Sequence, residues 1–272
     1  MQFEEITRAA ELLAGASRVV VSTGAGMSVD SGISAYRDKH GRWRDFTAFS
    51  RLGLSPVDFA HPPGYRSQPQ HAWAFAEYIR RQMADAPLHR GYEVLTHWLT
   101  SRFNESFLLT TNIDGLHRRA GVPESQFYER YGNIWELQCL EKCNPHWWPE
   151  NRRTLCTLNE ETMEASSFPT CPYCKGLARP RVQMAHDEQF IEKEVGWRFY
   201  QNFLDAGPID VYVIIGTTLW FSWPEGQQVP KIIHINPNPE THERYEDPLA
   251  ITMGAEDALT GIEWAWKQLE KS

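Results

Sequence analysis

The stretch GAGMSVDSGISAYR at residues 24–37 decides the fold, because it directly follows the apolar run VVV at residues 19–21. An apolar run that leads into a glycine-rich turn predicts a buried strand, a tight turn and then a helix. Gly24 and Gly26 let the backbone turn sharply and approach an anion closely, and Ser28 is a residue type that caps helices. A strand, a glycine-rich turn and a helix together form a pyrophosphate site. Taken alone, the turn is explained equally well by packing.

Length and composition bound the class of protein. The 272 residues, 42% of them hydrophobic, are enough for one large domain or for a large domain plus a small one. We expect no membrane partner, because no apolar run approaches the about 18 residues of a spanning helix. The net charge of −8 argues against nucleic acid as the main partner.

The cysteines and the N-terminal sequence predict a cytoplasmic location. MQFEE at residues 1–5 lacks the basic-then-apolar order of a secretory signal. Four of the five cysteines form two close pairs, which favours metal ligands in a reducing compartment over disulfides.

Strands alternate with helices along the chain. The runs at residues 19–22, 107–110, 211–215 and 231–235 predict buried parallel strands. Apolar residues recur at helical spacing over residues 4–16, 71–83, 89–100, 192–203 and 254–269. This alternation predicts a parallel α/β sheet with crossover connections.

The cysteine pairs predict a structural zinc site. Two residues separate Cys171 from Cys174, and three separate Cys139 from Cys143. Both spacings suit zinc knuckles, and four thiolates make a closed tetrahedral site without an open position for catalysis. Residues 139–180 also contain several prolines and no long periodic segment, so we interpret them as an inserted zinc-binding module.

These observations divide the chain into three parts. Residues 1–138 and 181–272 form the predicted large α/β domain, and residues 139–180 form the zinc-binding module. Residues 39–70 are rich in proline and glycine, and we expect them to form a loop region that covers a bound cofactor.

Three further motifs end predicted strands. TTNIDGLHRRAG occupies residues 110–121, IIGTTL occupies 214–219, and HIN occupies 234–236. Together with residues 24–37 and the cysteine pairs, their order resembles the sirtuin family over residues 5–268, nearly the whole chain. The resemblance implies a Rossmann-type parallel sheet domain with an inserted zinc module. It also implies an enzyme that consumes NAD and carries structural zinc.

The resemblance assigns a nucleotide site. The backbone of residues 24–28 would hold the pyrophosphate, and Asn112 and Asp114 would line the pocket for the carboxamide and the nicotinamide ribose. The competing interpretation of Asn112 and Asp114 is a helix cap in a turn. The expected cofactor-binding residues are Gly24, Ala25, Gly26, Ser28, Gly32, Ile33, Tyr36, Arg37, Thr111, Asn112, Ile113, Asp114, Gly216, Thr217, Thr218 and Asn236.

The sequence departs from the family at the catalytic base. Sirtuin deacylases place a histidine before glycine, eight residues ahead of the first zinc cysteine, and Tyr131 stands there in this chain. A phenol titrates at about pH 10 and an imidazole at about 6.5, so a tyrosine base would need its pKa lowered by roughly 3 units. We therefore favour a Tyr131 that orients the ribose or packs. The expected catalytic residues are Tyr131, Asn112 and Asp114.

A second departure concerns the acceptor. In sirtuins RPDVV and then FGE form a strand that pairs with the acyl-lysine peptide, whereas residues 179–187 read RPRVQMAHD and match only in the first half. Two acceptors remain open: an acyl-lysine of a protein or peptide, giving deacylation, or a protein side chain, giving ADP-ribosylation. The alternatives are a non-catalytic NAD or ADP-ribose binding module and an NAD glycohydrolase.

Overall fold

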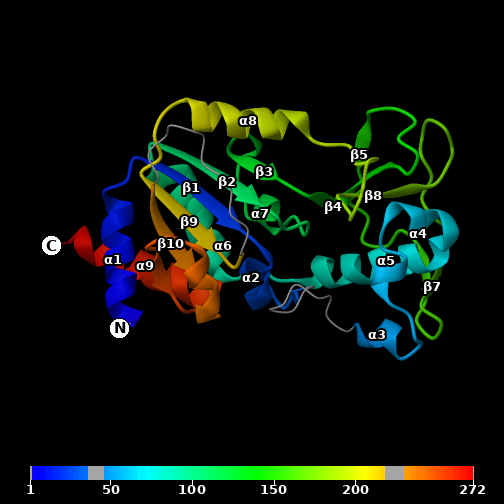
Figure 1. Ribbon diagram of the computed structural model, residues 1–272, viewed down its shortest axis with the longest axis horizontal. Coiled ribbons are helices and arrows are strands. Elements are labelled where there is room, and N and C mark those ends of the chain that lie inside the picture. Colours follow the sequence, from blue (N-terminus) through cyan, green and yellow to red (C-terminus); the bar gives the residue numbers. More distant parts are fainter. Residues whose placement is uncertain (1, 36–45, 218–229, 272) are drawn as a thin grey trace.

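A parallel sheet forms the larger part of the molecule. The computed structural model describes residues 2–35, 46–217 and 230–271. Among these residues, six strands pair in the order β11-β10-β9-β1-β2-β3, and every neighbouring pair is parallel. The strands are β1 (Arg18–Thr23), β2 (Glu105–Thr110), β3 (Phe127–Glu129), β9 (Val211–Ile215), β10 (Lys231–Ile235) and β11 (Leu249–Ile251). The predicted parallel α/β sheet is confirmed (Figure 1).

The chain reverses its direction across the sheet at β1. From β1 it runs outward to β2 and β3 on one side, and later to β9, β10 and β11 on the other. Thr23 at the end of β1 lies opposite Thr110 of β2 and Ile215 of β9. In open α/β sheets, ligands bind outside the carboxyl ends of the strands at such a reversal. The predicted motifs contain or directly follow these strand ends.

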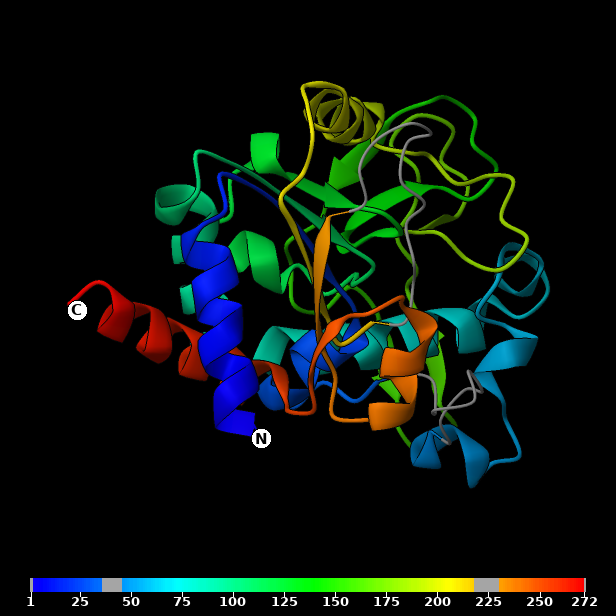
Figure 2. The ribbon, with the colours of Figure 1, turned by 60° about the vertical axis from the view of Figure 1, so that its left-hand side comes forward.

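Helices cover both faces of the sheet. The helices α1 (Gln2–Ala14), α6 (Arg90–His97) and α9 (Ala255–Leu269) share a hydrophobic core with Val19 and Val21. Val20 points to the opposite face, into a smaller core with α8 (Glu194–Asp205). Figures 1 and 2 show α8 above the sheet and α1 beside α9 at its other side. Burial on both faces explains why the strand sequences are continuous apolar runs.

Most predicted elements are present with shifted ends. The strands at 211–215 and 231–235 have the predicted bounds, while the helix expected at 192–203 begins at Glu194. The helix expected at 89–100 is divided into two elements. Its first part is α6, and a π-helical turn, η3 (Trp98–Arg102), follows directly. The edge strand β11 was not predicted, because three residues are too short to show a period.

The second half of the molecule is a smaller module (Figure 1, right). Its antiparallel sheet has the order β5-β4-β8, and β6 pairs with β7 in a hairpin. These elements are β4 (Gly132–Cys139), β5 (Trp147–Pro149), β6 (Thr157–Asn159), β7 (Glu164–Ser166) and β8 (Ala178–Val182). Because β4 and β8 extend past residues 138 and 181, the sheet crosses the predicted boundaries. The division into three parts stays a prediction.

Helices join this module. The long helix α5 (Pro69–Asp85) packs on β7, and α4 (Pro62–Ser67) packs on α5. The described part of the region 39–70, residues 46–70, thus contains short helices. The remaining short segments are α2 (Ala25–Ser28), η1 (Val29–Ser31), α3 (Thr47–Ser50), η2 (Pro56–Asp58), α7 (Leu116–Arg119), η4 (Glu124–Gln126) and η5 (Pro239–Arg244). Among the described residues, no helix is both long enough and apolar enough to cross a membrane.

Arg80 fastens α5 to the module. Its buried guanidinium donates to the carbonyl oxygens of Ile134, Glu150 and Arg152, the last at 2.6 Å. It also lies 4.4 Å from the centroid of the Trp135 ring. These bonds satisfy a charge that would otherwise be costly to bury.

Candidate functional site

The glycine turn is packed against the end of β9. The backbone nitrogen of Gly24 donates to Ile215 at 3.0 Å, and that of Gly26 donates to Gly216 at 2.9 Å. A Cβ on Gly26 would lie 2.6 Å from the Gly216 Cα, and one on Gly24 would lie 2.6 Å from the Thr217 Cβ. Only glycine fits at such a distance, so the turn and the end of β9 form one tightly packed wall at the reversal point.

A buried polar cluster lies behind the turn. The Ser28 hydroxyl donates to Asp114 Oδ2 at 2.7 Å. The Asn112 side-chain amide donates to the Gly24 carbonyl at 2.9 Å and lies 3.0 Å from Ser28 Oγ. Ser28, Asn112 and Asp114 are all buried. The first and second motifs, far apart in the sequence, therefore meet in one hydrogen-bonded cluster.

Asp114 has two separate roles in this cluster. Its Oδ1 accepts the backbone N–H of Leu116, the first residue of α7, at 2.8 Å, so the carboxylate does bind a helix terminus as the alternative interpretation held. Its Oδ2 faces Ser28, away from α7. Burial raises the pKa of Asp114, while the bonds from Leu116 and Ser28 and the charge of Arg119 oppose that shift. A buried carboxylate stabilises positive charge that develops beside it.

The other expected nucleotide residues surround this cluster. Thr111 donates its backbone N–H to Thr23 at 3.0 Å, and Ile33 donates to Ser28 at 3.2 Å. Ile113 accepts from Ile134, which connects the second motif to β4. Gly32 has a left-handed φ of 82°, and Ala25 is exposed at the tip of the turn. Tyr36, Arg37 and Thr218 lie outside the described residues.

Asn236 lies at the end of the neighbouring strand. The backbone nitrogen of Gly216 donates to Ile235 at 2.9 Å, so the ends of β9 and β10 are adjacent. The Asn236 side chain accepts from the backbone of Asn238 at 3.0 Å and is half-buried. It therefore lies on the same edge of the sheet as the turn, beside the end of β9.

Tyr131 lies where β3 passes into β4. Its carbonyl accepts the backbone N–H of Gln183 at 3.0 Å, so it adjoins the segment after β8. The adjacent Gly132 has a φ of 80°, and a Cβ there would lie 1.9 Å from the Arg181 carbonyl. Arg130, a possible source of charge for the phenol, forms an ion pair with Glu192 at 3.7 Å and stacks on Trp197. The Arg130 guanidinium therefore contacts Glu192, just before α8, and Trp197 within it.

Sequence reasoning missed Tyr92 and His89, which support the cluster from α6. The Tyr92 hydroxyl lies 3.1 Å from Ser28 Oγ. His89 Nε2 lies 2.8 Å from the Met27 carbonyl, and its Nδ1 accepts from the Gly91 backbone. A tyrosine within a helical apolar pattern indicates only core packing, so no sequence signal could have identified Tyr92 as part of the site.

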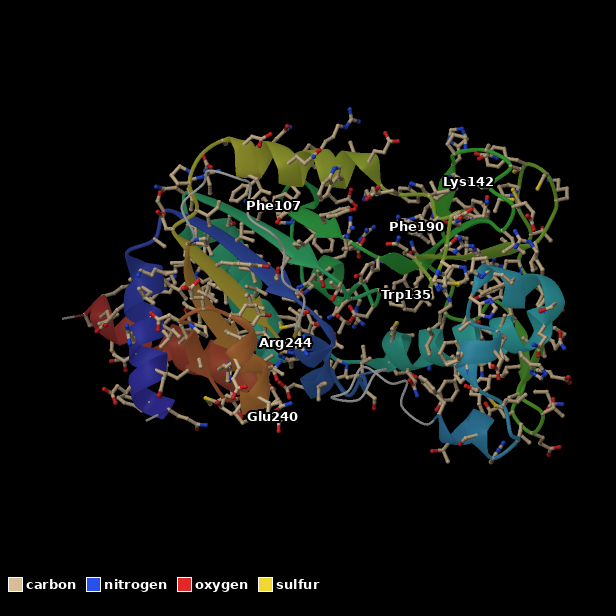
Figure 3. All side chains as sticks on the ribbon, viewed as in Figure 1. Phe107, Trp135, Lys142, Phe190, Glu240 and Arg244 are labelled. Atoms are coloured by element: carbon tan, nitrogen blue, oxygen red, sulfur yellow. The ribbon has the colours of Figure 1, made fainter. Side chains whose placement is uncertain are left out.

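Trp135 joins the cluster to the smaller module. Its indole nitrogen donates to the Asp114 carbonyl at 2.7 Å. Figure 3 shows Trp135 between the parallel sheet and α5, where Arg80 lies over its ring. The Trp135 side chain therefore contacts both the backbone of Asp114 in the site and Arg80 of α5.

A buried ionic chain lies beneath the Tyr131 segment, and it too was missed. Glu129 accepts from Arg118 at 2.6 Å and from Asn133 at 2.5 Å. Arg118 also lies 3.3 Å from Glu136, whose other oxygen pairs with Arg181. Burial raises the pKa of the Glu129 carboxyl to about 7, although the positive charge of Arg118 lowers it in part.

The four predicted zinc ligands are brought together. Cys139 Sγ lies 3.6 Å from Cys174 Sγ, and Cys143 Sγ lies 3.6 Å from Cys171 Sγ. All four sulfur atoms lie within 4.8 Å of one another. A tetrahedral zinc with bonds of about 2.3 Å needs sulfur atoms about 3.8 Å apart, so the predicted cluster fits structural zinc.

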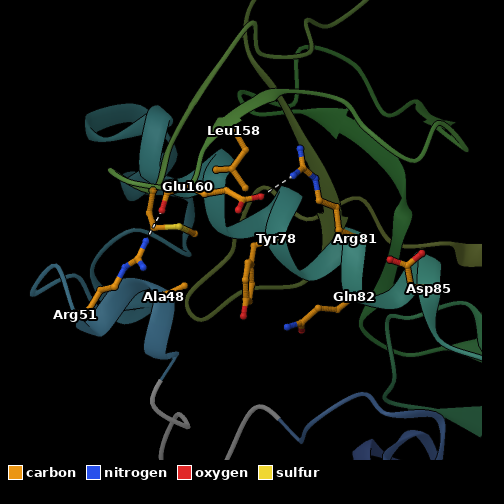
Figure 4. Close-up of a pocket in the computed structure, with 9 residues that line it drawn as sticks. Ala48, Arg51, Tyr78, Arg81, Gln82, Asp85, Leu158 and Glu160 are labelled. Atoms are coloured by element: carbon orange, nitrogen blue, oxygen red, sulfur yellow. Dashed lines mark hydrogen bonds and ion pairs between the residues drawn. The ribbon is translucent and has the colours of Figure 1, made fainter.

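A separate hollow of about 330 Å³ lies in the smaller module (Figure 4). Its lining comes from α3, α5 and the β6–β7 hairpin, and contains none of the predicted site residues. The Arg51 guanidinium donates to the Glu160 carbonyl at 2.5 Å, and Arg81 lies 3.5 Å from the Glu160 carboxylate. Both cations at this hollow already have partners.

A reversing parallel sheet with a glycine turn at its carboxyl edge defines a Rossmann-type protein. A family model described as "Sir2 family" matches residues 24–221. An NAD-dependent protein deacylase of Aquifex aeolicus is 33% identical over 74% of this chain and 72% of its own length. One from Thermus thermophilus is also 33% identical, over 79% of this chain and 75% of its own length. The chain belongs to the Sir2 family.

Solved structures agree on the fold. A Sir2 homologue mutant bound to ADP-ribose superposes with a TM-score of 0.72 at 20% identity, covering 97% of this chain and 98% of that one. A Sir2 homologue bound to NAD gives a TM-score of 0.70 at 20% identity, covering 96% and 94%. The predicted Rossmann-type sheet with a small cysteine-bearing module is thus confirmed.

Proposed function

We propose that this protein uses NAD to modify proteins, cleaving the bond between nicotinamide and ribose. The observation that carries the proposal is the buried Ser28–Asn112–Asp114 cluster behind the glycine turn. A binding module would need the turn to hold the pyrophosphate, but it would not need a buried carboxylate beside the turn. The name NAD-dependent protein deacylase, borne by the relatives in Aquifex and Thermus, supports the same reaction.

The residues take roles that follow from their positions. The backbone of residues 24–28 would bind the pyrophosphate, and residues 216–217 and Asn236 would bind the phosphate and ribose on the adenosine side. Asn112 and Ile113 would hold the nicotinamide half. Asp114 would stabilise positive charge that develops on the ribose as nicotinamide leaves.

We propose deacylation as the first candidate reaction. The carbonyl oxygen of an acyl-lysine would attack the ribose carbon as the bond to nicotinamide breaks. A ribose hydroxyl would then attack the carbon of the resulting imidate, and with the addition of water the lysine amine would leave while the acyl group stays on the ribose. The names of the relatives support this acceptor. Tyr131 would orient that hydroxyl by a hydrogen bond.

ADP-ribosyl transfer is the second candidate, and Tyr131 favours it. Transfer to a protein side chain needs only the first bond exchange and no base for the ribose hydroxyl. Arg130 pairs with Glu192 and lies over the Trp197 ring, so its guanidinium already has partners on that side.

The deciding experiment measures nicotinamide release from labelled NAD with and without an acetylated peptide pool, for wild type and Tyr131→His. Peptide-dependent release with deacetylated product supports deacylation. Release with label on protein supports ADP-ribosyl transfer, and release with only free ADP-ribose indicates a glycohydrolase. NAD binding without release would leave a binding module. Tyr131→His is expected to raise deacetylation if Tyr131 limits the second step.

We also propose the metal ligands, the acceptor and the location that accompany this reaction. Cys139, Cys143, Cys171 and Cys174 would hold zinc as a structural ion, away from the reacting bond. The acceptor would be a protein or peptide, with neither nucleic acid nor a membrane as partner. The four clustered sulfur atoms suit metal ligands rather than disulfides, which supports the predicted cytoplasmic location.

A further inference from the structure

Tyr92 reaches the site from a helix that carries none of the predicted site residues. It lies in α6, and its side chain is buried. Its hydroxyl oxygen lies 3.1 Å from Ser28 Oγ. The direction of this bond decides what Tyr92 does.

The donors and acceptors around Ser28 fix that direction. A serine hydroxyl has one proton to donate and two lone pairs that accept. With Asp114 ionised, the Ser28 proton goes to its carboxylate, which can only accept. The Asn112 amide fills one lone pair of Ser28. Tyr92 must therefore donate to the other lone pair, and Ser28 is saturated.

The ring of Tyr92 is held on both sides. It lies 4.7 Å from the His89 ring and 4.9 Å from the His117 ring, measured between centroids. His89 is fixed by Met27 and Gly91, and His117 Nε2 lies 2.8 Å from Thr23 Oγ1. The phenol oxygen thus has a defined position. Burial raises the pKa of Tyr92 well above its usual value, so the hydroxyl keeps the proton it donates.

We propose that Tyr92 is a positioning residue for nicotinamide release, acting through Ser28 to keep Asp114 ionised and oriented. This inference rests on the proposed function. The donated bond leaves Ser28 a single rotamer and a single acceptor for its proton. It also polarises the Ser28 hydroxyl toward Asp114, because hydrogen bonds in a chain strengthen one another.

Removal of the phenol oxygen has a predictable consequence. Ser28 would regain an open lone pair and could turn its proton away from Asp114. The carboxylate would then lose part of the hydrogen bonding that opposes its burial, and its pKa would rise further. The other titratable groups around Tyr92 and Asp114 are Arg119, His89, His117 and Asp30. A Tyr92→Phe substitution leaves them in place.

The test compares Tyr92→Phe with Tyr212→Phe in the full chain. Tyr212 provides a matched control, because its hydroxyl lies 2.5 Å from Ser22 Oγ and is buried on the opposite face of the sheet. The first measurement is the Asp114 pKa from its carboxyl carbon NMR shift, assigned with Asp114→Asn. The second is the pH profile of nicotinamide release.

We expect Tyr92→Phe to raise the Asp114 pKa by about half a unit to one unit. In the pH profile of kcat, the acid limb should move to higher pH by the same amount. The value of kcat should fall about fivefold, while the KM for NAD stays nearly unchanged. Tyr212→Phe should change only the melting temperature.

An Asp114 pKa that is the same in Tyr92→Phe and wild type would overturn the inference. So would an equal shift in Tyr212→Phe, because that would indicate a general loss of stability. If the wild type releases no nicotinamide, the proposed function fails, but the Asp114 titration still tests the role of Tyr92.

Discussion

The side-chain amide of Asn112 donates to the carbonyl of Gly24 at 2.9 Å, across 88 residues of sequence. This bond fixes the end of β2 to the turn after β1, on the side where the sheet reverses. The same amide group reaches Ser28, so one side chain sets the distance between the predicted pyrophosphate turn and Asp114. Asn112 therefore connects the turn after β1 to the end of β2.

Asn112→Ala is expected to reduce nicotinamide release by roughly 100-fold or more, the usual cost of removing a positioned donor. The free energy of unfolding should fall by about 1–3 kcal/mol, because two acceptors lose their donor. Asn104→Ala serves as the control, since Asn104 precedes β2 and donates to Ser17 on the exposed edge. Unchanged release in Asn112→Ala would remove the site assignment.

Gly26→Ala is expected to destabilise the protein by about 1–3 kcal/mol and to weaken NAD binding. The added methyl group would lie 2.6 Å from the Gly216 backbone, which cannot move aside without distorting the end of β9. The control is Gly261→Ala, whose methyl group would have the Ile6 side chain as its nearest neighbour, at 3.5 Å. In the middle of α9 that change should stabilise by about 0.5–1 kcal/mol. Chemical denaturation checks both; equal effects would contradict the packing argument.

Removal of zinc should unfold the smaller module first. A strong chelator is expected to lower the melting temperature by roughly 10 °C or more, because binding of a structural metal contributes directly to folding. Cys171→Ser should start at the lower melting temperature and show little further response to chelator. A wild-type melting curve unaltered by chelation, with the metal measured as removed, would refute structural zinc.

Glu129 should make stability fall as the pH rises. Its folded pKa of about 7 lies above the ordinary glutamate value of about 4.3, so the folded state binds more protons between these values. Stability from this group is present below about pH 4.3 and is lost as the pH rises toward 7. Glu129→Gln cannot titrate, so its stability relative to wild type should increase by roughly 2–4 kcal/mol across that range. Urea unfolding at several pH values checks this; a constant difference would count against a raised pKa.

The sequence predicted what depends on periodicity and spacing. Val19–Val21 and residues 211–215 are continuous apolar runs because helices bury both faces of those strands. The spacing within each cysteine pair predicted two metal knuckles, and the four sulfur atoms lie within 4.8 Å of one another. These signals are local, so a single sequence contains them.

What could not be predicted depends on contacts across the fold. Tyr92 looks like any core residue of a helix until α6 is placed beside Ser28. The ionic chain from Glu129 to Arg181 joins β3, α7, β4 and β8, whose mutual placement no local pattern specifies. Trp135 joins the two halves of the molecule only because β4 begins close to the second motif. Propensity carries no information on such pairings.

The interlocked glycines Gly24, Gly26 and Gly216 impose a constraint on sequence change. A side chain added on either loop would collide with the other loop's backbone or side chain, so no single substitution at one position can be accommodated by change at the other. Laboratory evolution that diversifies this site should therefore recover glycine at all three positions, whatever acceptor is selected. Variation in specificity would accumulate instead after β8, where Gln183, Ala185 and His186 are exposed.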